Sequence, residues 1–105
     1  MITLKVLTLN GCSYCDNYKR LLDLQHIKYV EIFCSDNENC DWCDSIEAIS
    51  GSELYPMTIV NNQFILCMTD NYDMLGKSIK NNHYTINYFK DSASIYNHIL
   101  SIIKK

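Results

Sequence analysis

Apolar and polar residues follow clear local patterns in the first part of the chain. Residues 2–9 are rich in leucine and β-branched residues and stop at Asn10-Gly11, which predicts a strand. From Ser13 to about Gln25 the spacing is helical, and the expected apolar face consists of Tyr18, Leu21, Leu22 and Leu24. Residues 29–33 form a second apolar run. This order predicts a βαβ unit whose two parallel strands lie at the centre of a sheet.

A second helix and a hairpin are predicted in the middle of the chain. The helix is expected from about Asp41 to Ser50, with Gly51 as its C-cap and a buried face made of Trp42, Ile46 and Ile49. Residues 57–60 and 63–67 have the composition of two strands. A two-residue turn, Asn61-Asn62, is expected to join them, because asparagine tolerates the positive φ of such turns.

The last third of the chain is predicted to contain one more helix. Residues 91–105 place Ile95, Ile99 and Ile102 on one face, and Lys104-Lys105 suit the negative end of the helix dipole. Residues 83–89 have the composition of a strand, although no partner strand is evident. An extra strand or hairpin is therefore expected at about 75–90.

Composition and charge limit the functional classes. The 105 residues suit one domain spanning 1–105, and a net charge of -3 offers no basic surface for nucleic acid. No apolar run approaches the roughly 20 residues that span a bilayer, and Lys5 interrupts the N-terminal run, unlike a signal peptide. A cytoplasmic protein without nucleic-acid or membrane partners is expected. Six cysteines in that reducing compartment favour redox chemistry or metal binding over structural bridges.

The strongest functional feature is Cys12-Ser13-Tyr14-Cys15, between the first predicted strand and helix. Within a βαβ unit this spacing favours a redox site. A helix N-terminus stabilises a thiolate and lowers the pKa of a cysteine from about 8.5 to roughly 3.5–7.5. Cys12 is therefore expected to attack a substrate disulfide and Cys15 to resolve the mixed disulfide. A zinc site shared with Cys40 and Cys43 is the alternative, although a strand–turn–helix is the wrong context for it.

These features resemble the glutaredoxin family of thioredoxin-fold proteins. The resemblance covers about residues 2–70 and includes Ser50-Gly51-Ser52-Glu53-Leu54-Tyr55-Pro56, which is similar to the family's Thr-Gly-x-x-Thr-Val-Pro. It implies an α/β thioredoxin fold, a mixed four-stranded sheet flanked by helices, and thiol–disulfide oxidoreductase activity. It also implies a cis Tyr55–Pro56 bond in a loop that faces Cys12 and presents backbone groups to a substrate peptide or to glutathione.

The resemblance implies that Tyr55, Pro56 and Asp70 contact the substrate, and the aromatic ring of Tyr14, between the two cysteines, is expected to face it as well. Asp70 falls near the acidic residue with which the family holds the amine of glutathione. Three departures weaken the glutathione site: Leu54 replaces the loop threonine, Leu66-Cys67 replaces a Gly-Gly pair, and Leu9 replaces a basic residue. The expected partner is a disulfide-containing protein, with glutathione as a further candidate co-substrate.

Ser13 stands where many members of the family have proline. In the family, loosening of this turn is associated with a [2Fe-2S] cluster held between two subunits by the first cysteine and glutathione. A cluster-binding or zinc-binding module without turnover is therefore the alternative function. A monomer is expected for the enzyme and a dimer for the cluster-bound form.

Cys34, Cys40 and Cys43 form a second group of cysteines. Negative charge surrounds Cys40, from Asp36, Glu38, Asp41 and Asp44. Because like charge disfavours a thiolate, Cys12 is expected to be the more reactive thiol. Three interpretations of the group stay open: reduced cysteines, an auxiliary disulfide that exchanges electrons with the first pair, or metal ligands. Cys67 is most simply a core residue.

Overall fold

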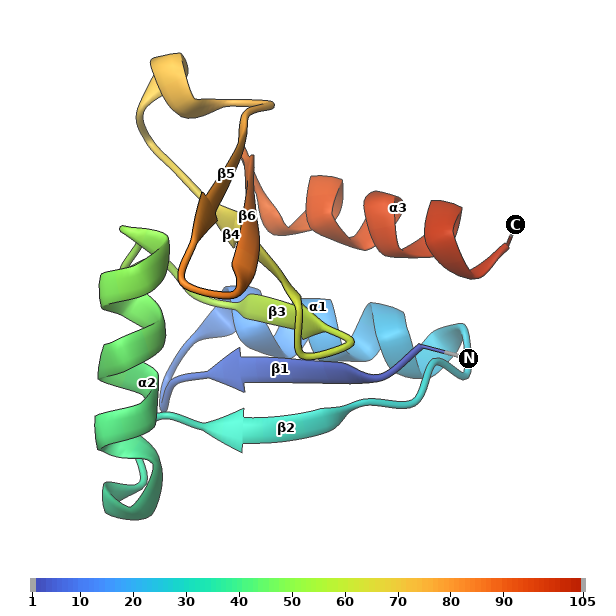
Figure 1. Ribbon diagram of the computed structural model, residues 1–105. Helices are drawn as coiled ribbons and strands as arrows, with labels where there is room; N and C mark the ends of the chain where they lie inside the picture. The colour runs from blue at the N-terminus through green and yellow to red at the C-terminus, as the bar shows by residue number, and fades with distance from the viewer. Residues whose placement is uncertain (1, 105) are drawn as a thin grey trace.

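A mixed sheet of six strands organises residues 2–104, which are the residues that the structure, a computed structural model, describes. In chain order the strands are β1 (Leu4–Thr8), β2 (Val30–Phe33), β3 (Met57–Val60), β4 (Phe64–Met68), β5 (Ser78–Asn81) and β6 (Tyr84–Phe89). In space they follow the order β2-β1-β3-β4-β6-β5 (Figure 1). The helices are α1 (Ser13–Leu24), α2 (Asn37–Ser50) and α3 (Ser92–Ile103), and a short 3₁₀ turn, η1, spans Tyr72–Met74. The predicted thioredoxin-like α/β fold is confirmed, with a hairpin added to its four-stranded sheet.

The predicted βαβ unit is present, but it lies at one side of the sheet. β1 runs parallel to β2, with Leu7 opposite Ile32, and antiparallel to β3. The expectation that the parallel pair lies at the sheet centre is wrong, because β2 is an edge strand. Its first residues, Val30 and Glu31, are accordingly exposed, whereas the apolar residues of β1 are buried.

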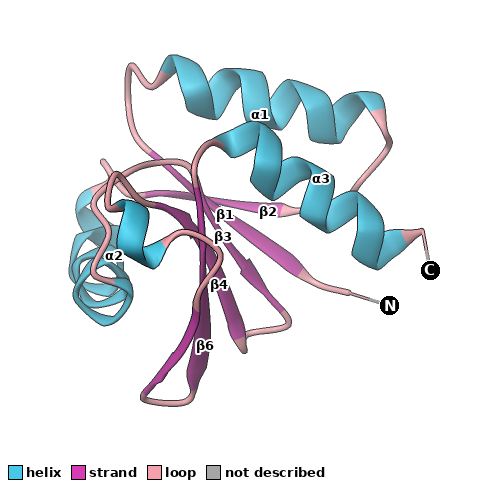
Figure 2. Cartoon of the chain, turned by 90° about the horizontal axis from the view of Figure 1, so that it is seen from above, coloured by secondary structure: helices cyan, strands magenta, loops and turns pink. Residues whose placement is uncertain are grey.

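Helices cover both faces of the sheet. Figure 2 shows α1 and α3 side by side over one face and α2 on the other. Tyr18 and Leu22 of α1 pack with Ile95 and Ile99 of α3 against the sheet, so periodic apolar positions in both helices do bury their side chains. Leu24, also expected on this face, is 67% exposed, because its place two residues after Leu22 turns its side chain about 160° away from that of Leu22 around the helix.

Helix α2 differs from its prediction in its start and in its buried face. It begins at Asn37 rather than near Asp41, because residues 37–39 join the helix although they are polar and carry no apolar period. The buried residues of α2 are Cys43, Ile46 and Ser50. Trp42 is 36% exposed, with Lys5 Nζ 5.9 Å from its ring centroid, so the expected Trp42 core face is wrong. Gly51 ends the helix with a φ of 72°, as expected for a C-cap.

The hairpin of β3 and β4 is closed by a longer turn than predicted. Asn61 and Asn62 have φ angles of 54° and 55°, the left-handed conformation expected of them. Val60 pairs with Phe64, however, so Gln63 belongs to the turn and the expected two-residue connection is wrong. The turn is instead closed by the Gln63 N–H, which donates to the Val60 carbonyl oxygen at 3.0 Å.

The expected extra hairpin is formed by β5 and β6. β6 pairs in parallel with β4, which extends the sheet beyond its four-stranded part, and β5 pairs antiparallel with β6. Two side chains of the hairpin reach the end of α2: the Tyr88 hydroxyl donates to the Ser50 carbonyl oxygen, and Asn81 Nδ2 donates to the Ile49 carbonyl oxygen at 2.9 Å. The hairpin therefore satisfies carbonyl groups that the last turn of α2 leaves without helical partners.

The C-terminal helix begins as predicted. Asp91 is the N-cap of α3, and its Oδ1 accepts the Ser94 N–H at 2.8 Å. The helix ends at Ile103, and Lys104 is its C-cap. Lys105, expected at the negative end of the dipole, lies outside the described residues. Within residues 2–104, no helix has both the length and the apolar composition needed to cross a membrane.

Candidate functional site

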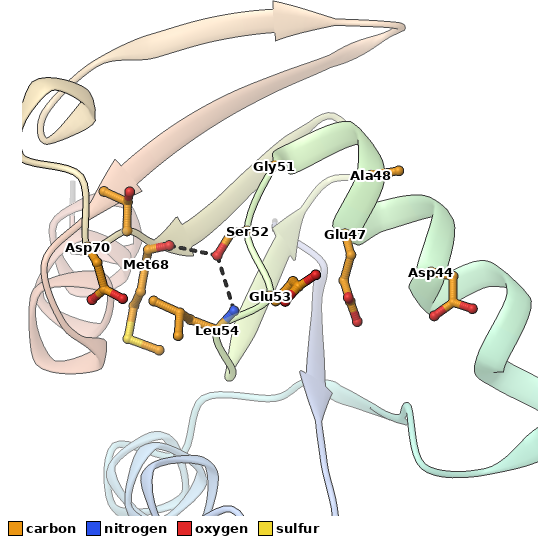
Figure 3. A pocket seen from close by; sticks show the side chains of 10 residues that line it. Asp44, Glu47, Ala48, Gly51, Ser52, Glu53, Leu54, Met68 and Asp70 are labelled. Carbon is orange, nitrogen blue, oxygen red and sulfur yellow. Dashed lines mark hydrogen bonds between the residues drawn. The ribbon is translucent and has the colours of Figure 1, made fainter.

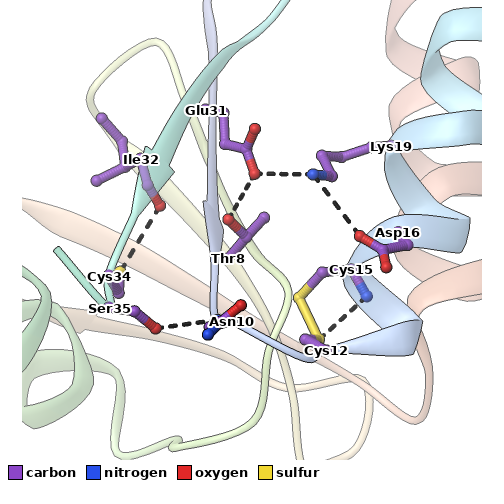
Figure 4. A network of polar contacts seen from close by, with 10 residues as sticks. All are labelled: Thr8, Asn10, Cys12, Cys15, Asp16, Lys19, Glu31, Ile32, Cys34 and Ser35. Carbon is purple, nitrogen blue, oxygen red and sulfur yellow. Dashed lines mark hydrogen bonds and ion pairs between the residues drawn. A yellow bond between two sulfur atoms is a disulfide. The ribbon is translucent and has the colours of Figure 1, made fainter.

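Cys12 and Cys15 lie at the start of α1, after the turn that follows β1. Cys12 is the N-cap of α1, and the two cysteines form a disulfide with their Cα atoms 5.2 Å apart. Cys12 is half-buried, whereas Cys15, one turn into the helix, is 1% exposed. The Cys15 backbone N–H donates to Cys12 Sγ at 3.1 Å (Figure 4). The sulfur of Cys12 thus receives a hydrogen bond from the first turn of a helix, which favours negative charge on it after reduction.

Lys19 of α1, a basic residue near the two cysteines, is paired with carboxylates. Lys19 Nζ lies 2.9 Å from Glu31 Oε2 and 3.8 Å from Asp16 Oδ1 (Figure 4). Glu31 also accepts a hydrogen bond from the Thr8 hydroxyl at 2.7 Å. The bond from Thr8 has the largest effect on the pKa of the Glu31 carboxyl group and, together with the bond from Lys19, lowers it. Lys19 is thus engaged with two carboxylates, whereas the N-terminus of α1 lies directly at Cys12.

The loop before β3 faces the first cysteine. The Tyr55–Pro56 peptide bond is cis, and the Tyr55 carbonyl oxygen lies 3.8 Å from Cys12 Sγ. Tyr55 is 7% exposed, and its hydroxyl donates to Glu47 Oε2 of α2 at 2.5 Å. Burial, followed by the bond to Glu47, raises the pKa of Tyr55, and the nearby Asp44 and Cys40 add to this effect. Helix α2 thus holds the loop through the tyrosine hydroxyl.

Most of the expected substrate-binding residues lie around one cleft. Tyr14, Tyr55 and Asp70 line a cleft of about 230 Å³, together with Leu54, Met68, Lys90, Asp91 and Ser92. Tyr14 is 67% exposed, so its ring is free to contact a substrate beside the disulfide. Pro56 is buried and does not line this cleft. The cleft has aromatic, apolar, acidic and basic side chains, and Tyr14 and Tyr55 bring it next to the disulfide.

A larger acidic cleft adjoins the first one. Its volume is about 620 Å³, and it shares Leu54, Met68 and Asp70 with the smaller cleft (Figure 3). Its charged lining residues are all carboxylates, namely Asp44, Glu47, Glu53 and Asp70. The Ser52 hydroxyl donates to the Met68 carbonyl oxygen at 2.7 Å and accepts the Leu54 N–H at 3.3 Å, which ties the loop after α2 to the end of β4.

Sequence reasoning missed the acidic cleft, although a signal for it exists. No lysine, arginine or histidine occurs between Lys28 and Lys77. Carboxylates in that stretch have no basic neighbour along the chain to neutralise them. The end of α2, the loop after it and the end of β4 bring four of them together.

The second cysteine group is partly oxidised. Cys34, directly after β2, forms a disulfide with Cys43 of α2, and Cys40 is a free, exposed thiol. Among the described residues, no group of three or more histidine, cysteine, aspartate or glutamate side chains is arranged to hold a metal ion. Cys67 is a free thiol in the core at 0% exposure, and burial raises its pKa to about 12. Cys67 is therefore a poor nucleophile at neutral pH.

One comparison with known proteins bears on this site. A family model described as glutaredoxin matches residues 2–65. The matched segment runs from before β1 into β4 and contains Cys12, Cys15 and the Tyr55–Pro56 loop. No curated protein matches the chain.

Proposed function

Because the chain belongs to the glutaredoxin family, we propose that it is an enzyme that reduces or exchanges disulfides through Cys12 and Cys15. The observation that carries this proposal is the place of Cys12 at the N-cap of α1, where its sulfur accepts the Cys15 N–H. This contact supports a thiolate on Cys12, and the exposure of 1% at Cys15 supports a resolving role that needs no outside access.

The proposed cycle has two exchange steps. The Cys12 thiolate attacks one sulfur of a substrate disulfide, a mixed disulfide forms, and the other substrate sulfur leaves as a thiolate. The Cys15 thiolate then attacks Cys12 Sγ, which releases the second substrate sulfur and forms the Cys12–Cys15 disulfide. The substrate gains two electrons and, after protonation, two protons. A pair of external thiols or a dithiol returns the cysteines to the reduced state.

The preferred substrate is proposed to be a peptide or protein disulfide flanked by positive charge. Tyr14, Tyr55 and Asp70 are proposed to contact it beside the cysteines, while the buried Pro56 holds the backbone of the loop. The lining of the acidic cleft supports this preference, because its four carboxylates attract cations and repel the two carboxylates of glutathione. Glutathione is proposed as a reductant rather than as the best-bound substrate.

The proposed setting is a monomer of one domain in a reducing compartment such as the cytoplasm. The arrangement of β5 and β6 supports a single domain, because they continue the same sheet as the matched segment. A reducing compartment supplies the thiols that the cycle consumes.

The test compares a peptide disulfide with basic flanks and a glutathione mixed disulfide as substrates. Cys12→Ser is expected to abolish turnover of both substrates. Cys15→Ser is expected to lose activity toward the peptide disulfide and to keep activity toward the glutathione mixed disulfide. Cys67→Ser, which removes a buried thiol outside the cycle, is the matched control and should retain both activities. Full activity of Cys15→Ser toward the peptide disulfide would contradict the mechanism.

The charge preference has its own test. The same peptide disulfide with acidic flanks is expected to show a kcat/KM roughly tenfold lower, equivalent to ~1.4 kcal/mol. The difference should shrink at about 1 M salt, where the Debye length is about 3 Å. It should also shrink in Glu53→Gln, which removes one exposed carboxylate of the cleft. Equal kcat/KM values at low salt would refute the proposed substrate class and leave the cysteine mechanism standing.

A further inference from the structure

The Cys34–Cys43 disulfide is shielded from external thiols. Cys34 is 6% exposed and Cys43 is 1% exposed, and both pack in the core with Leu7, Ile46 and Tyr55. Thiol–disulfide exchange requires a thiolate to approach one sulfur directly. An external thiol therefore has no open path to this bond in the folded protein.

Cys40 lies at the outer side of the same disulfide. It is an exposed free thiol on α2, three residues before Cys43, so the two side chains lie on neighbouring positions of one helix face. Cys40 Sγ lies 3.9 Å from the carbonyl oxygen of Cys34. A single exposed thiol thus contacts the backbone of one partner of a buried disulfide and lies about one helical turn from the other.

We propose that Cys40 is the access thiol of a second redox centre, through which the buried Cys34–Cys43 disulfide exchanges electrons with external monothiols. This centre is separate from the proposed Cys12 and Cys15 cycle, and neither of those cysteines takes part in it. The external reactant is a small or peptide-borne thiol that reaches the exposed N-terminal half of α2.

The exchange proceeds in three balanced steps. The Cys40 thiolate attacks Cys34 Sγ, a Cys34–Cys40 disulfide forms, and Cys43 leaves as a thiolate that takes up a proton. An external thiolate attacks Cys40 Sγ, which forms a mixed disulfide on Cys40 and releases the thiolate of Cys34. A second external thiolate attacks the external sulfur of the mixed disulfide and frees Cys40. Two external thiols become one external disulfide, and Cys34 and Cys43 gain two electrons and two protons.

Carboxylates of α2 and of its N-cap make this entrance acidic. The helix and its N-cap carry Asp36, Glu38, Asp41, Asp44 and Glu47, and the chain has no basic residue between Lys28 and Lys77. A cationic thiol such as cysteamine is therefore expected to reach Cys40 more readily than glutathione, which carries net negative charge. This advantage should diminish as salt is added.

The experiment uses the full chain with Cys12→Ser, Cys15→Ser and Cys67→Ser, so that only the second group can react. The oxidised protein is mixed with cysteamine or with glutathione, the reaction is quenched with acid and an alkylating reagent, and mass spectrometry of peptides follows each cysteine. The addition of Cys40→Ser or Cys40→Ala is expected to slow the reduction of Cys34–Cys43 at least tenfold. A transient mixed disulfide is expected on Cys40.

Controls separate chemistry from altered folding. Circular dichroism checks that both Cys40 variants keep their helices, because the replaced side chain is exposed. Asp41→Cys added to Cys40→Ser supplies a thiol one position along α2, and it should not restore the rate, because it points about 100° away around the helix. Unchanged reduction rates in the Cys40 variants, or a mixed disulfide found first on Cys34 or Cys43, would overturn the proposal. Neither result would affect the proposed cycle of Cys12 and Cys15, because both are replaced by serine in the variant tested.

Discussion

The hydrogen bond from Tyr55 to Glu47 yields a prediction that links packing to activity. It joins α2 to the loop whose carbonyl oxygen lies 3.8 Å from Cys12 Sγ. Tyr55→Phe removes the hydroxyl group and keeps the ring that packs in the core. Glu47→Ala removes the acceptor, and Glu47→Gln keeps an oxygen that can accept the same bond.

The size of the effect follows from the type of bond. A hydrogen bond to a charged group contributes about 1.5–3 kcal/mol to stability. Since Glu47 is only half-buried and partly solvated, we expect the lower end of that range, about 1.5 kcal/mol, for Tyr55→Phe. If the same free energy stabilises the position of the loop in the transition state, its loss lowers kcat/KM for the peptide disulfide by about tenfold.

A double-mutant cycle measures the interaction itself. Urea unfolding and steady-state kinetics are compared for wild type, Tyr55→Phe, Glu47→Ala and the double variant. We expect a coupling free energy of about 1 kcal/mol in both measurements, with Glu47→Gln close to wild type in stability. Effects that add to within ~0.3 kcal/mol would show that the two residues act independently and would refute this reasoning.

Three further predictions concern stability, each measured by urea unfolding. Glu31→Gln should cost up to ~1 kcal/mol at neutral pH, because the carboxylate is partly exposed. Hydrogen bonds from Thr8 and Lys19 lower the pKa of Glu31 in the folded state. The contribution of Glu31 to stability is therefore complete above the unfolded pKa of about 4.3 and is lost as the pH falls through the folded pKa, so the stabilities of wild type and variant should converge in acid. A difference in stability that persists in acid would contradict the assignment. Thr58→Val should cost ~1–3 kcal/mol, because it leaves the buried Tyr18 hydroxyl without its 2.6 Å partner, and adding Tyr18→Phe should recover part of that loss. Asp91→Ala should cost ~1 kcal/mol as the loss of an N-cap, whereas Asp91→Asn should be nearly neutral.

Local patterns in the sequence predicted the elements that are stabilised by nearby residues. The strand, turn and helix around Cys12 could be predicted because the apolar period and the N-cap position lie within a few residues of each other. The position of β2 at the sheet edge could not, because it depends on which strands pair on the far side of β1. The start of α2 at Asn37 was missed because its first turn is polar and is stabilised by the fold rather than by an apolar face.

The pairing of the second cysteine group was not predictable from spacing. Three cysteines allow three different disulfides. The packing of α2 against the sheet buries Cys43, rather than Cys40, next to Cys34. The acidic cleft depends on tertiary structure in the same way, because Asp70 follows β4 while Asp44 and Glu47 belong to α2. Identity and charge of these residues were visible in the sequence, but their proximity was not.

The contacts of the β5–β6 hairpin with α2 mean that the matched segment is not a self-contained module. Tyr88 and Asn81 lie beyond residues 2–65, yet they hold the carbonyl groups of Ser50 and Ile49 directly before the loop that leads to Pro56. A chain shortened to the matched segment would keep every cysteine up to Cys43 and lose the support of that loop. Transplanting this site into another protein would therefore require the β5–β6 hairpin as well.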